Sequence, residues 1–483
     1  MHPTGDLAAW VARTGFADLP PRVVEEAKSQ VLSVLGAVHA GAGTDAARAV
    51  LRAVAGWPGP AEATCIPDGR RTALAPALYA NAALSMALDY DDYLFAGHTG
   101  HSAVLASLAV AEQRGLGGRD VLTAQVLANE VEGRIGASVL LGPLNGQLWS
   151  FIHLAGGAVI AAKLAGLDAE RTAAALGIAL LQPNYPLWAG FFSSGAKVLL
   201  AAQTVVAGVQ AADLAGAGLS GCPDVLEHPQ GFVCAFAREP LWGAYGGLGR
   251  TWLTDTLCYK IYPGCAYVDT MVDCVLRLVR EHRPDPARVR RIAVGATPLT
   301  LGMEGLAAPH LRGPASAPVT LNFTVGYNAA VALIDGELTP RQFTPARVAD
   351  PAVWDLAGRV TLALDEEMSE RMREASLLRT KDGGWSLDLE NADLTAFRMA
   401  FGARVRFDLD DGAILETTEE VPLGGAGRPQ AERRAAAAEK FMREAAARLG
   451  ERRAAEVVTL VEGLDTLDAK GLRALIAAAC RAR

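Results

Sequence analysis

Apolar residues recur at helical spacing over most of the first 272 residues, and short Gly, Pro or Asp breaks separate the segments. Alanine and leucine dominate these segments and β-branched residues are few, which favours helices over strands. Asp168 stands where a helix N-cap is expected. The pattern predicts helices over residues 20–42, 45–56, 74–88, 102–114, 118–141, 152–164, 169–181 and 196–216.

The pattern changes near residue 284. Residues 289–295, 359–364 and 403–409 alternate like strands, and a helical signal returns over 328–333. Asp410-Asp411-Gly412 leads from the last of these strands into a further alternating run, which predicts a hairpin. From Gln430 onward the chain is Ala/Arg/Glu-rich and again helical, and Gly424-Gly-Ala-Gly-Arg-Pro429 is the best linker candidate.

These signals predict a mainly α fold. A large helical domain is expected over residues 1–272, a smaller α+β domain over 273–427, and C-terminal helices over 428–483 that pack on the first domain.

Composition and charge narrow the choice of partners. Net charge is −8 and no basic stripe is visible, which argues against nucleic acid as a partner. No signal peptide is visible at the N-terminus.

The longest apolar stretch, residues 198–221, contains Gln203, Gln210 and Asp213 and suits a buried core helix better than a membrane span. Seven scattered cysteines without a CxxC pair indicate free thiols and a reducing cytoplasm.

Common cofactor motifs do not occur in the chain. One GxGxxG match, Gly216 to Gly221, closes a predicted helix instead of linking a strand to a helix, so it indicates a glycine-rich helix end. We therefore expect an enzyme that uses a small-molecule substrate and no cofactor.

The segment from Leu88 to His101 carries the densest candidate chemistry. It places Asp89, Asp91 and Asp92 close to His98 and His101, between two apolar helices. Carboxylates and imidazoles at the mouth of a pocket have shifted pKa values, which proton transfer requires. A solvated loop with an Asp N-cap is the alternative interpretation. A metal site is a third, although the spacing matches no standard zinc pattern, so no metal is expected.

Two lysines and several aromatic residues are further candidates. Lys197 opens an apolar helix, where it either reaches solvent or binds a carboxylate. Lys260 lies among apolar and aromatic neighbours, either partly buried as an acid or base or extending past them to water. His153 lies on an apolar face, as a core residue or a ligand contact. Trp149, Trp188, Phe191 and Phe192 either line a pocket or fill the core.

Taken in order, several segments resemble the MmgE/PrpD family almost end to end. They include Leu88-Asp-Tyr-Asp-Asp, His101-Ser-Ala-Val-Leu, Lys260-Ile-Tyr-Pro-Gly-Cys and Tyr327-Asn-Ala-Ala-Val. The resemblance implies a large helical domain completed by the C-terminal helices and an inserted α+β lid. It also implies an active site in the cleft between them, a homodimer, and no metal or organic cofactor.

The resemblance also implies roles for individual residues. Asp89 matches the first aspartate of the family motif and would orient His101 or His98 as general acid or base. Lys197 and Lys260 would stabilise enolate-like charge, and Tyr262 or Tyr93 would protonate a leaving group. The expected substrate contacts are Tyr93, Gln147, Trp149, His153, Trp188 and Cys265.

Departures from the family pattern bear on the substrate. Histidines of the family fall on Gln147, Leu200 and Asp269 here, and a threonine falls on Tyr93. Because a tricarboxylate needs several cationic partners, a less anionic and more apolar substrate than methylcitrate is expected, as in a pathway of specialised metabolism.

The leading hypothesis is a cofactor-independent lyase of the dehydratase type. An epimerase, isomerase or decarboxylase using the same proton chemistry is the second hypothesis. A non-catalytic binding protein on the same fold is the third.

Overall fold

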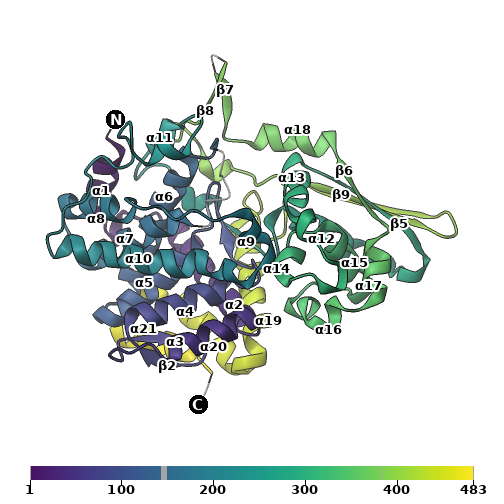
Figure 1. Cartoon of the computed structure of the whole chain (residues 1–483), viewed down its shortest axis with the longest axis horizontal. Coiled ribbons are helices and arrows are strands. Elements are labelled where there is room, and N and C mark those ends of the chain that lie inside the picture. The colour runs from purple at the N-terminus through teal and green to yellow at the C-terminus, as the bar shows by residue number, and fades with distance from the viewer. Residues whose placement is uncertain (1, 143–149, 382, 482–483) are drawn as a thin grey trace.

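The computed structural model describes residues 2–142, 150–381 and 383–481. Helices form most of this part of the chain, so the predicted mainly α class is confirmed. Figure 1 shows two lobes: a helical lobe that carries both termini, and a smaller lobe built from α12–α17 and a four-stranded sheet. We call this smaller lobe the lid.

The helical lobe combines the first half of the chain with its C-terminal end. Its principal helices are α1 (Pro3–Arg13), α2 (Pro21–Gly41), α3 (Asp45–Ala55), α4 (Leu74–Met86), α5 (Gly100–Arg114), α6 (Gly118–Ser138), α7 (Phe151–Leu164), α8 (Ala169–Ala179), α9 (Trp188–Ser193), α10 (Leu199–Gly216), α11 (Phe232–Phe236), α19 (Gln430–Leu449), α20 (Glu451–Glu462) and α21 (Ala469–Ala478). Short strands β1 (Ala63–Cys65), β2 (Arg70–Thr72), β3 (Asp92–Tyr93) and β4 (Cys258–Tyr259) form two antiparallel pairs, β1 with β2 and β3 with β4.

The position of each helix follows from its apolar pattern. Helix α7 is apolar on every side, and it lies in the middle of the lobe against α5, α6, α8 and α10. Helix α3 is amphipathic, and it lies at the edge with only Ala47 and Val54 buried. Gly157 and Gly208 let α7 and α10 approach closely, because a Cβ on either glycine would meet backbone atoms of the other helix within 2.5 Å.

The stretch Gly195–Gly216 is, among the described residues, long and apolar enough to cross a membrane. In the fold its α10 part packs on α7 and α8. The helix predicted to begin at residue 196 starts later, since Gly195–Val198 forms a 3₁₀ turn before α10. Lys197 therefore lies in this turn and not in the first turn of α10.

The lid is built on a sheet with strand order β10-β9-β5-β6, in which β5 and β6 are parallel and the other neighbours antiparallel. Gly412, with φ +86°, turns the chain between β9 and β10 and confirms the predicted hairpin. Helices α12 and α15 pack on the sheet. The lid elements are α12 (Ala266–His282), β5 (Val289–Ala296), α13 (Pro298–Ala307), α14 (Pro318–Leu321), α15 (Val325–Asp335), α16 (Pro345–Val348), α17 (Pro351–Ala357), β6 (Val360–Leu364), β9 (Ala403–Leu409) and β10 (Ile414–Glu419). Between β6 and β9 the chain also forms α18 (Glu366–Ala375) and a separate antiparallel pair, β7 (Arg379–Lys381) with β8 (Gly384–Ser386).

The C-terminal helices return to the helical lobe, where α19 packs along α2. Buried Arg433 of α19 pairs with Glu26 of α2. The segment favoured as a linker is itself packed, because the Tyr259 amide donates to the Gly424 carbonyl at 2.9 Å. The C-terminal helices are thereby held against the strands that carry the site.

Candidate functional site

The segment between α4 and α5 brings distant residues together. Strand β3 within it pairs with β4, with Asp92 opposite Tyr259 and Tyr93 opposite Cys258. Lys260 directly follows β4, so this pairing places its side chain beside Asp91. No pattern in the sequence indicated the pairing, because two-residue strands carry no periodicity.

Lys260 bridges two aspartates. Its Nζ donates to Asp91 Oδ1 at 2.8 Å and to the Asp89 carbonyl at 2.9 Å, and lies 3.6 Å from Asp89 Oδ1. Asp89 adopts the left-handed backbone conformation, φ +55°, a region that few non-glycine residues occupy and that is enriched at functional sites. Lys197 Nζ lies 3.1 Å from the same Asp89 oxygen. Two ammonium groups thus face two carboxylates.

These four side chains are almost completely buried. Burial lowers the pKa of Lys197, although Asp89 opposes the shift. Burial alone would also lower the pKa of Lys260, but Asp89 and Asp91 raise it above its ordinary value. Lys260 therefore carries its charge at neutral pH.

Asp91 also contacts two imidazoles. Its Oδ2 lies 2.9 Å from His98 Nδ1 and 3.3 Å from His101 Nε2, while Ser85 Oγ lies 2.7 Å from His101 Nδ1. Burial opposes ionisation of Asp91, but Lys260 and the two imidazoles hold its pKa well below the usual range. Burial lowers the pKa of His98 to about 4, against the opposing effect of Asp91. The sequence favoured Asp89 for orienting a histidine, whereas in the structure Asp91 makes these contacts.

We call Asp89, Asp91, His98, His101, Lys197 and Lys260 the ion cluster.

An aromatic wall adjoins the ion cluster. Lys197 Nζ lies 4.4 Å from the ring centroids of Phe191 and Phe323. The Trp188 ring lies 5.5 Å from that of Phe191, and Thr320 of the lid donates to the Phe192 carbonyl at 2.6 Å. Both lobes therefore contribute to this side of the site, which offers apolar surface next to an ammonium group.

The remaining predicted site residues lie at varied positions. Tyr93 is buried, with its ring 5.8 Å from that of His98. The Tyr262 hydroxyl donates to Asp273 at 2.8 Å, on the lid side of the cluster. Cys265 caps the start of α12, and burial raises the pKa of its thiol to about 12. Gln147 and Trp149 lie outside the described residues.

His153 lies beside the ion cluster, with its ring centroid 5.5 Å from that of His101. Its Nδ1 is 2.7 Å from Ser102 Oγ, which is also within 2.8 Å of both carboxyl oxygens of Glu132. Sequence reasoning missed Ser85, Ser102 and Glu132, and it placed Asp91 in the candidate proton-transfer segment without giving it a role of its own. The available signal was the group of polar residues, Glu132 among them, that interrupts the apolar positions of the helix predicted over residues 118–141.

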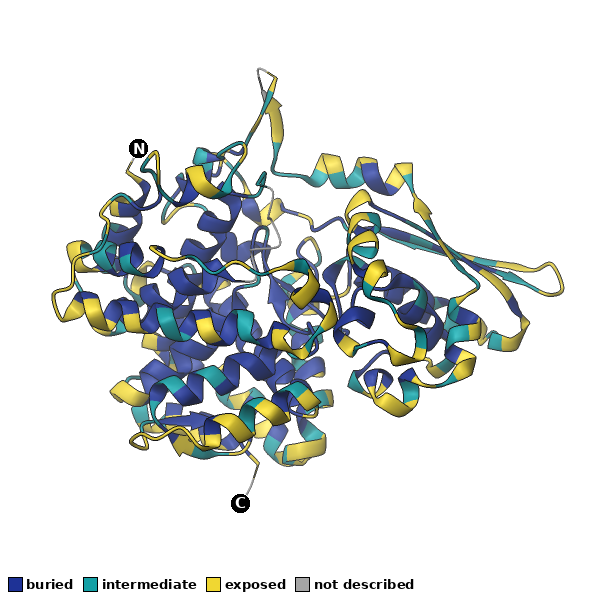
Figure 2. Ribbon diagram, in the orientation of Figure 1, coloured by how far each residue is buried: buried dark blue, intermediate teal, exposed yellow. Residues whose placement is uncertain are grey.

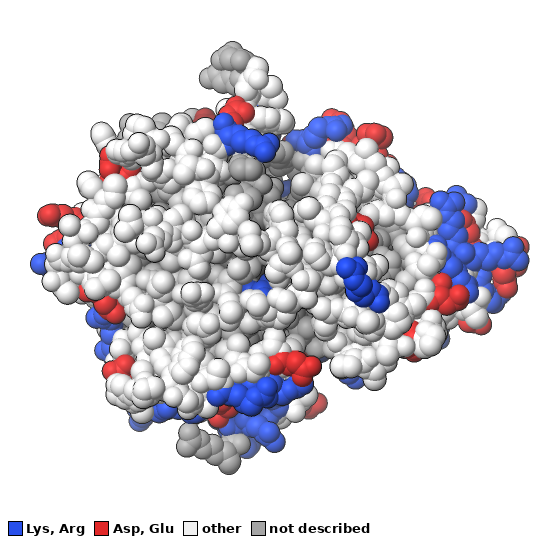
Figure 3. Space-filling model, viewed as in Figure 1, with Lys and Arg blue, Asp and Glu red and all other residues white. Residues whose placement is uncertain are grey.

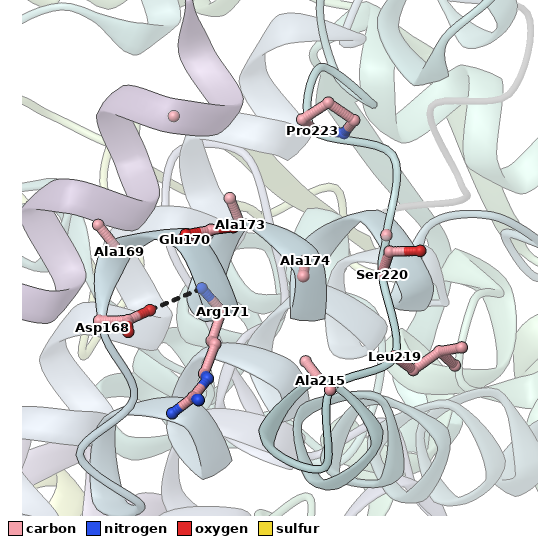
Figure 4. A pocket seen from close by; sticks show the side chains of 13 residues that line it. Asp168, Ala169, Glu170, Arg171, Ala173, Ala174, Ala215, Leu219, Ser220 and Pro223 are labelled. Carbon is pink, nitrogen blue, oxygen red and sulfur yellow. Dashed lines mark hydrogen bonds between the residues drawn. The ribbon is translucent and has the colours of Figure 1, made fainter.

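Two hollows in the surface differ in their relation to the cluster. One, of about 650 Å³, lies beside the GxGxxG match, and most of the side chains that line it are small or apolar (Figure 4). Asp168 is one of its few charged residues, and its carboxylate caps α8 by accepting a hydrogen bond from the Arg171 amide. The other, of about 660 Å³, lies between the lobes and is lined by Leu88 and Gly195, close in sequence to Asp89 and Lys197. The second is the better placed for access to the site.

Charged side chains gather at the outer end of the lid and are few over the middle of the face shown in Figure 3. Within the described ranges, no group of three or more His, Cys, Asp or Glu side chains is arranged to hold a metal ion. The Lys260 ammonium fills the space between the two aspartates of the cluster.

Comparison with known proteins agrees with this architecture. The MmgE/PrpD N-terminal domain matches residues 5–243, and the MmgE/PrpD C-terminal domain matches residues 262–466. A cis-aconitate decarboxylase of Aspergillus terreus (strain NIH 2624 / FGSC A1156) is 26% identical over 446 residues, covering 87% of this chain and 85% of the relative. A second Aspergillus terreus protein of that name is 26% identical over 489 residues, covering 96% and 93%. The resemblance seen in the sequence is confirmed: the chain belongs to the MmgE/PrpD family.

Proposed function

We propose that this protein is a lyase that forms a carbanion or enolate next to a substrate carboxylate and needs neither metal nor organic cofactor. The observation that carries the proposal is the ion cluster, in which two buried lysines, two aspartates and two imidazoles converge from three segments of the chain. The names of the two fungal relatives support lyase chemistry.

The charge balance of the cluster bears on the substrate class. Its two ammonium groups already face two carboxylates, so one substrate carboxylate at Lys197 adds one negative charge. Each further carboxylate would be buried without another lysine of the cluster to pair with it, at a cost of several kcal/mol. A monocarboxylate with an apolar portion against the Phe191–Phe323 wall fits best.

The chemistry follows from the positions of these groups. Lys197 holds the substrate carboxylate and stabilises the charge that develops on it. The imidazole of His98 or His101, both of which contact Asp91, takes the proton from the adjacent carbon. Asp91 then stabilises the imidazolium that forms. Departure of a β-hydroxyl with a proton completes a dehydration.

Decarboxylation is the second candidate, and the two relatives favour it. In that reaction the bond to the carboxyl carbon breaks, CO₂ leaves, and an acid of the site protonates the resulting carbanion. In decarboxylation the negative charge develops on the carbon that loses CO₂, so Lys197 would stabilise it through a carbonyl group conjugated with that carbon.

A charge series of substrates tests the proposal. The EDTA-treated protein is incubated with 3-hydroxybutyrate, malate, citrate and cis-aconitate, with proton NMR for alkene signals and a detector for CO₂. We expect turnover, with the highest kcat/KM for an acid that carries one carboxylate. Preference for the tricarboxylates would contradict the substrate class, and activity only with added metal would contradict the cofactor-free mechanism. Tight binding without turnover would favour a binding protein.

A further inference from the structure

Glu132 lies buried beneath the site, on α6. Both of its carboxyl oxygens lie 2.7–2.8 Å from Ser102 Oγ, and its Oε2 is 3.4 Å from His153 Nδ1. Glu132, Ser102 and His153 are all fully buried. The Glu132 side chain packs against α7 at Gly156, which has no side chain; a Cβ at this position would lie 1.9 Å from Glu132 Oε1. The backbone of α7 thus leaves space for this carboxyl group one turn from His153.

No lysine or arginine pairs with Glu132 among the described residues; His153 is its one potential cationic partner. Burial raises the pKa of Glu132 well above its usual range, and Ser102 only partly offsets the shift. Burial likewise lowers the pKa of His153 well below its usual range, helped by His101 and His98. The neutral acid next to the neutral imidazole is therefore favoured over an ion pair.

One order of hydrogen bonds satisfies the neutral pair. A protonated Glu132 can donate to Ser102 Oγ, and the Ser102 hydroxyl, which also lies 3.0 Å from the Thr99 carbonyl, can then donate to His153 Nδ1 at 2.7 Å. In this order the imidazole proton is left on Nε2. Within the described part of the chain, His153 Nε2 is buried without a hydrogen-bond partner. The His153 and His101 rings meet at 76°, edge to face, so the second imidazole adjoins the ion cluster.

We propose that Glu132, acting through Ser102, makes His153 the proton donor of this site. When His153 gives its Nε2 proton to the substrate carbanion or leaving oxygen, the Ser102 proton moves to Nδ1 and the Glu132 proton moves to Ser102. The imidazole and the serine end unchanged in charge, and Glu132 becomes a carboxylate. The next proton taken up by the site restores the acid. Of these three residues, His153 is the catalytic one, because it would meet the substrate, and Glu132 and Ser102 are positioning residues.

This role rests on the proposed function, but its first test does not need turnover. Nitrogen-15 NMR of histidine-labelled protein, with His153 assigned by a His153→Gln variant, reports which ring nitrogen carries the proton. We expect a neutral His153 with the proton on Nε2 from about pH 5 to about pH 8. A proton on Nδ1, or a doubly protonated ring in this range, would overturn the proposal even if the enzyme were active.

Kinetics give the second test. Glu132→Gln keeps the shape and a donor to Ser102 but has no proton to release, so kcat should fall about 10²-fold with little change in KM. Ser102→Ala breaks the same path, so the double variant should lose no more than the single variants. Unchanged kcat in Glu132→Gln, or additive losses, would overturn the relay.

A matched control lies on the helix that carries Ser102. Glu112→Gln is the same exchange about 15 Å further along α5, where Glu112 bonds Thr64 and Arg71 at the surface end of the lobe. This variant should keep the kcat of the wild type. Circular dichroism of all variants separates loss of folding from loss of proton transfer, and Glu132→Gln should retain the His153 tautomer seen in the wild type.

Discussion

The site contains two carboxyl groups that support imidazoles, and their surroundings differ in one respect. Asp91 contacts His98 and His101 and also receives a hydrogen bond from Lys260 at 2.8 Å. Glu132 reaches His153 through Ser102, with no lysine or arginine beside it in the described structure. Both carboxyl groups are fully buried, yet the pKa of Asp91 is lowered and that of Glu132 is raised.

The difference shows how one pocket can hold a base and an acid of the same residue types. A buried carboxyl group is neutral unless a cation compensates for lost hydration, and Lys260 provides that cation for Asp91 but not for Glu132. The ionised Asp91 favours proton uptake by its imidazoles, and the neutral Glu132 favours proton release through His153. The following variants change one side of this contrast at a time.

Removal of the Lys260 ammonium group should have the largest effect. Lys260→Met leaves Asp91 and Asp89 with one ammonium group fewer, so the free energy of unfolding should fall by about 3–5 kcal/mol and activity should be lost. Denaturant unfolding measures the change. Lys470→Met, the same exchange at an exposed position, is the control and should unfold like the wild type. Equal stability of the two variants would mean that Lys260 does not compensate for the buried aspartates.

Neutralising Asp91, the carboxylate that contacts His98 and His101, should reduce catalysis more than stability. Asp91→Asn keeps the shape of the side chain but cannot stabilise an imidazolium, so kcat should fall about 10²–10⁴-fold. Steady-state kinetics with the best substrate of the charge series measure this loss. Asp213→Asn on the surface should have no effect. An Asp91→Asn enzyme with wild-type kcat would assign the base elsewhere.

A third buried lysine, Lys440, provides a pH test. Burial lowers the pKa of Lys440 to about 7 from 10.5, against the opposing effect of Asp91 and Asp92. Below about pH 7 the folded and unfolded chains both carry this proton. Above it the unfolded chain binds more protons, so stability rises with pH by up to about 1.4 kcal/mol per unit.

Unfolding of wild type and Lys440→Met at several pH values isolates this contribution. The unfolding free energy of the wild type, minus that of Lys440→Met, should increase between about pH 7 and pH 9. A difference that stays constant with pH would show that Lys440 keeps its charge in the folded protein.

The smallest effect is expected at Ser85. Ser85→Ala removes the 2.7 Å contact to His101 Nδ1, but Asp91 still holds the other ring nitrogen. The loss of one hydrogen bond should cost about 1 kcal/mol of stability. Thermal unfolding and kcat measure it, and a loss as large as that of Asp91→Asn would reverse the ranking of the two contacts.

Much of the fold could be predicted from the sequence because its helices are long and periodic. Predicted residues 20–42 and 45–56 correspond to Pro21–Gly41 and Asp45–Ala55, and the Asp410–Gly412 hairpin is present. Short elements could not be predicted in this way. The β3–β4 pair spans two residues on each strand, and hydrogen bonding between distant segments defines it.

The site was predictable only in part, for the same reason. Asp89, His98, His101, Lys197 and Lys260 could be selected by type and by family resemblance, and the structure brings them together. Their partners could not be assigned, because the β3–β4 pairing decides that Lys260 meets Asp91 and the packing of α5, α6 and α7 decides that Ser102 meets Glu132.

Deuterium exchange separates proton abstraction at the Asp91 side of the site from proton donation at the Glu132 side. The EDTA-treated protein is placed in D₂O with the best substrate of the charge series, and NMR follows deuterium at the carbon next to the carboxylate in recovered substrate and in product. We predict deuterium incorporation by the wild type, retained exchange into substrate in Glu132→Gln, and loss of exchange in Asp91→Asn. Absence of deuterium in the wild type during turnover, or equal loss in both variants, would contradict it.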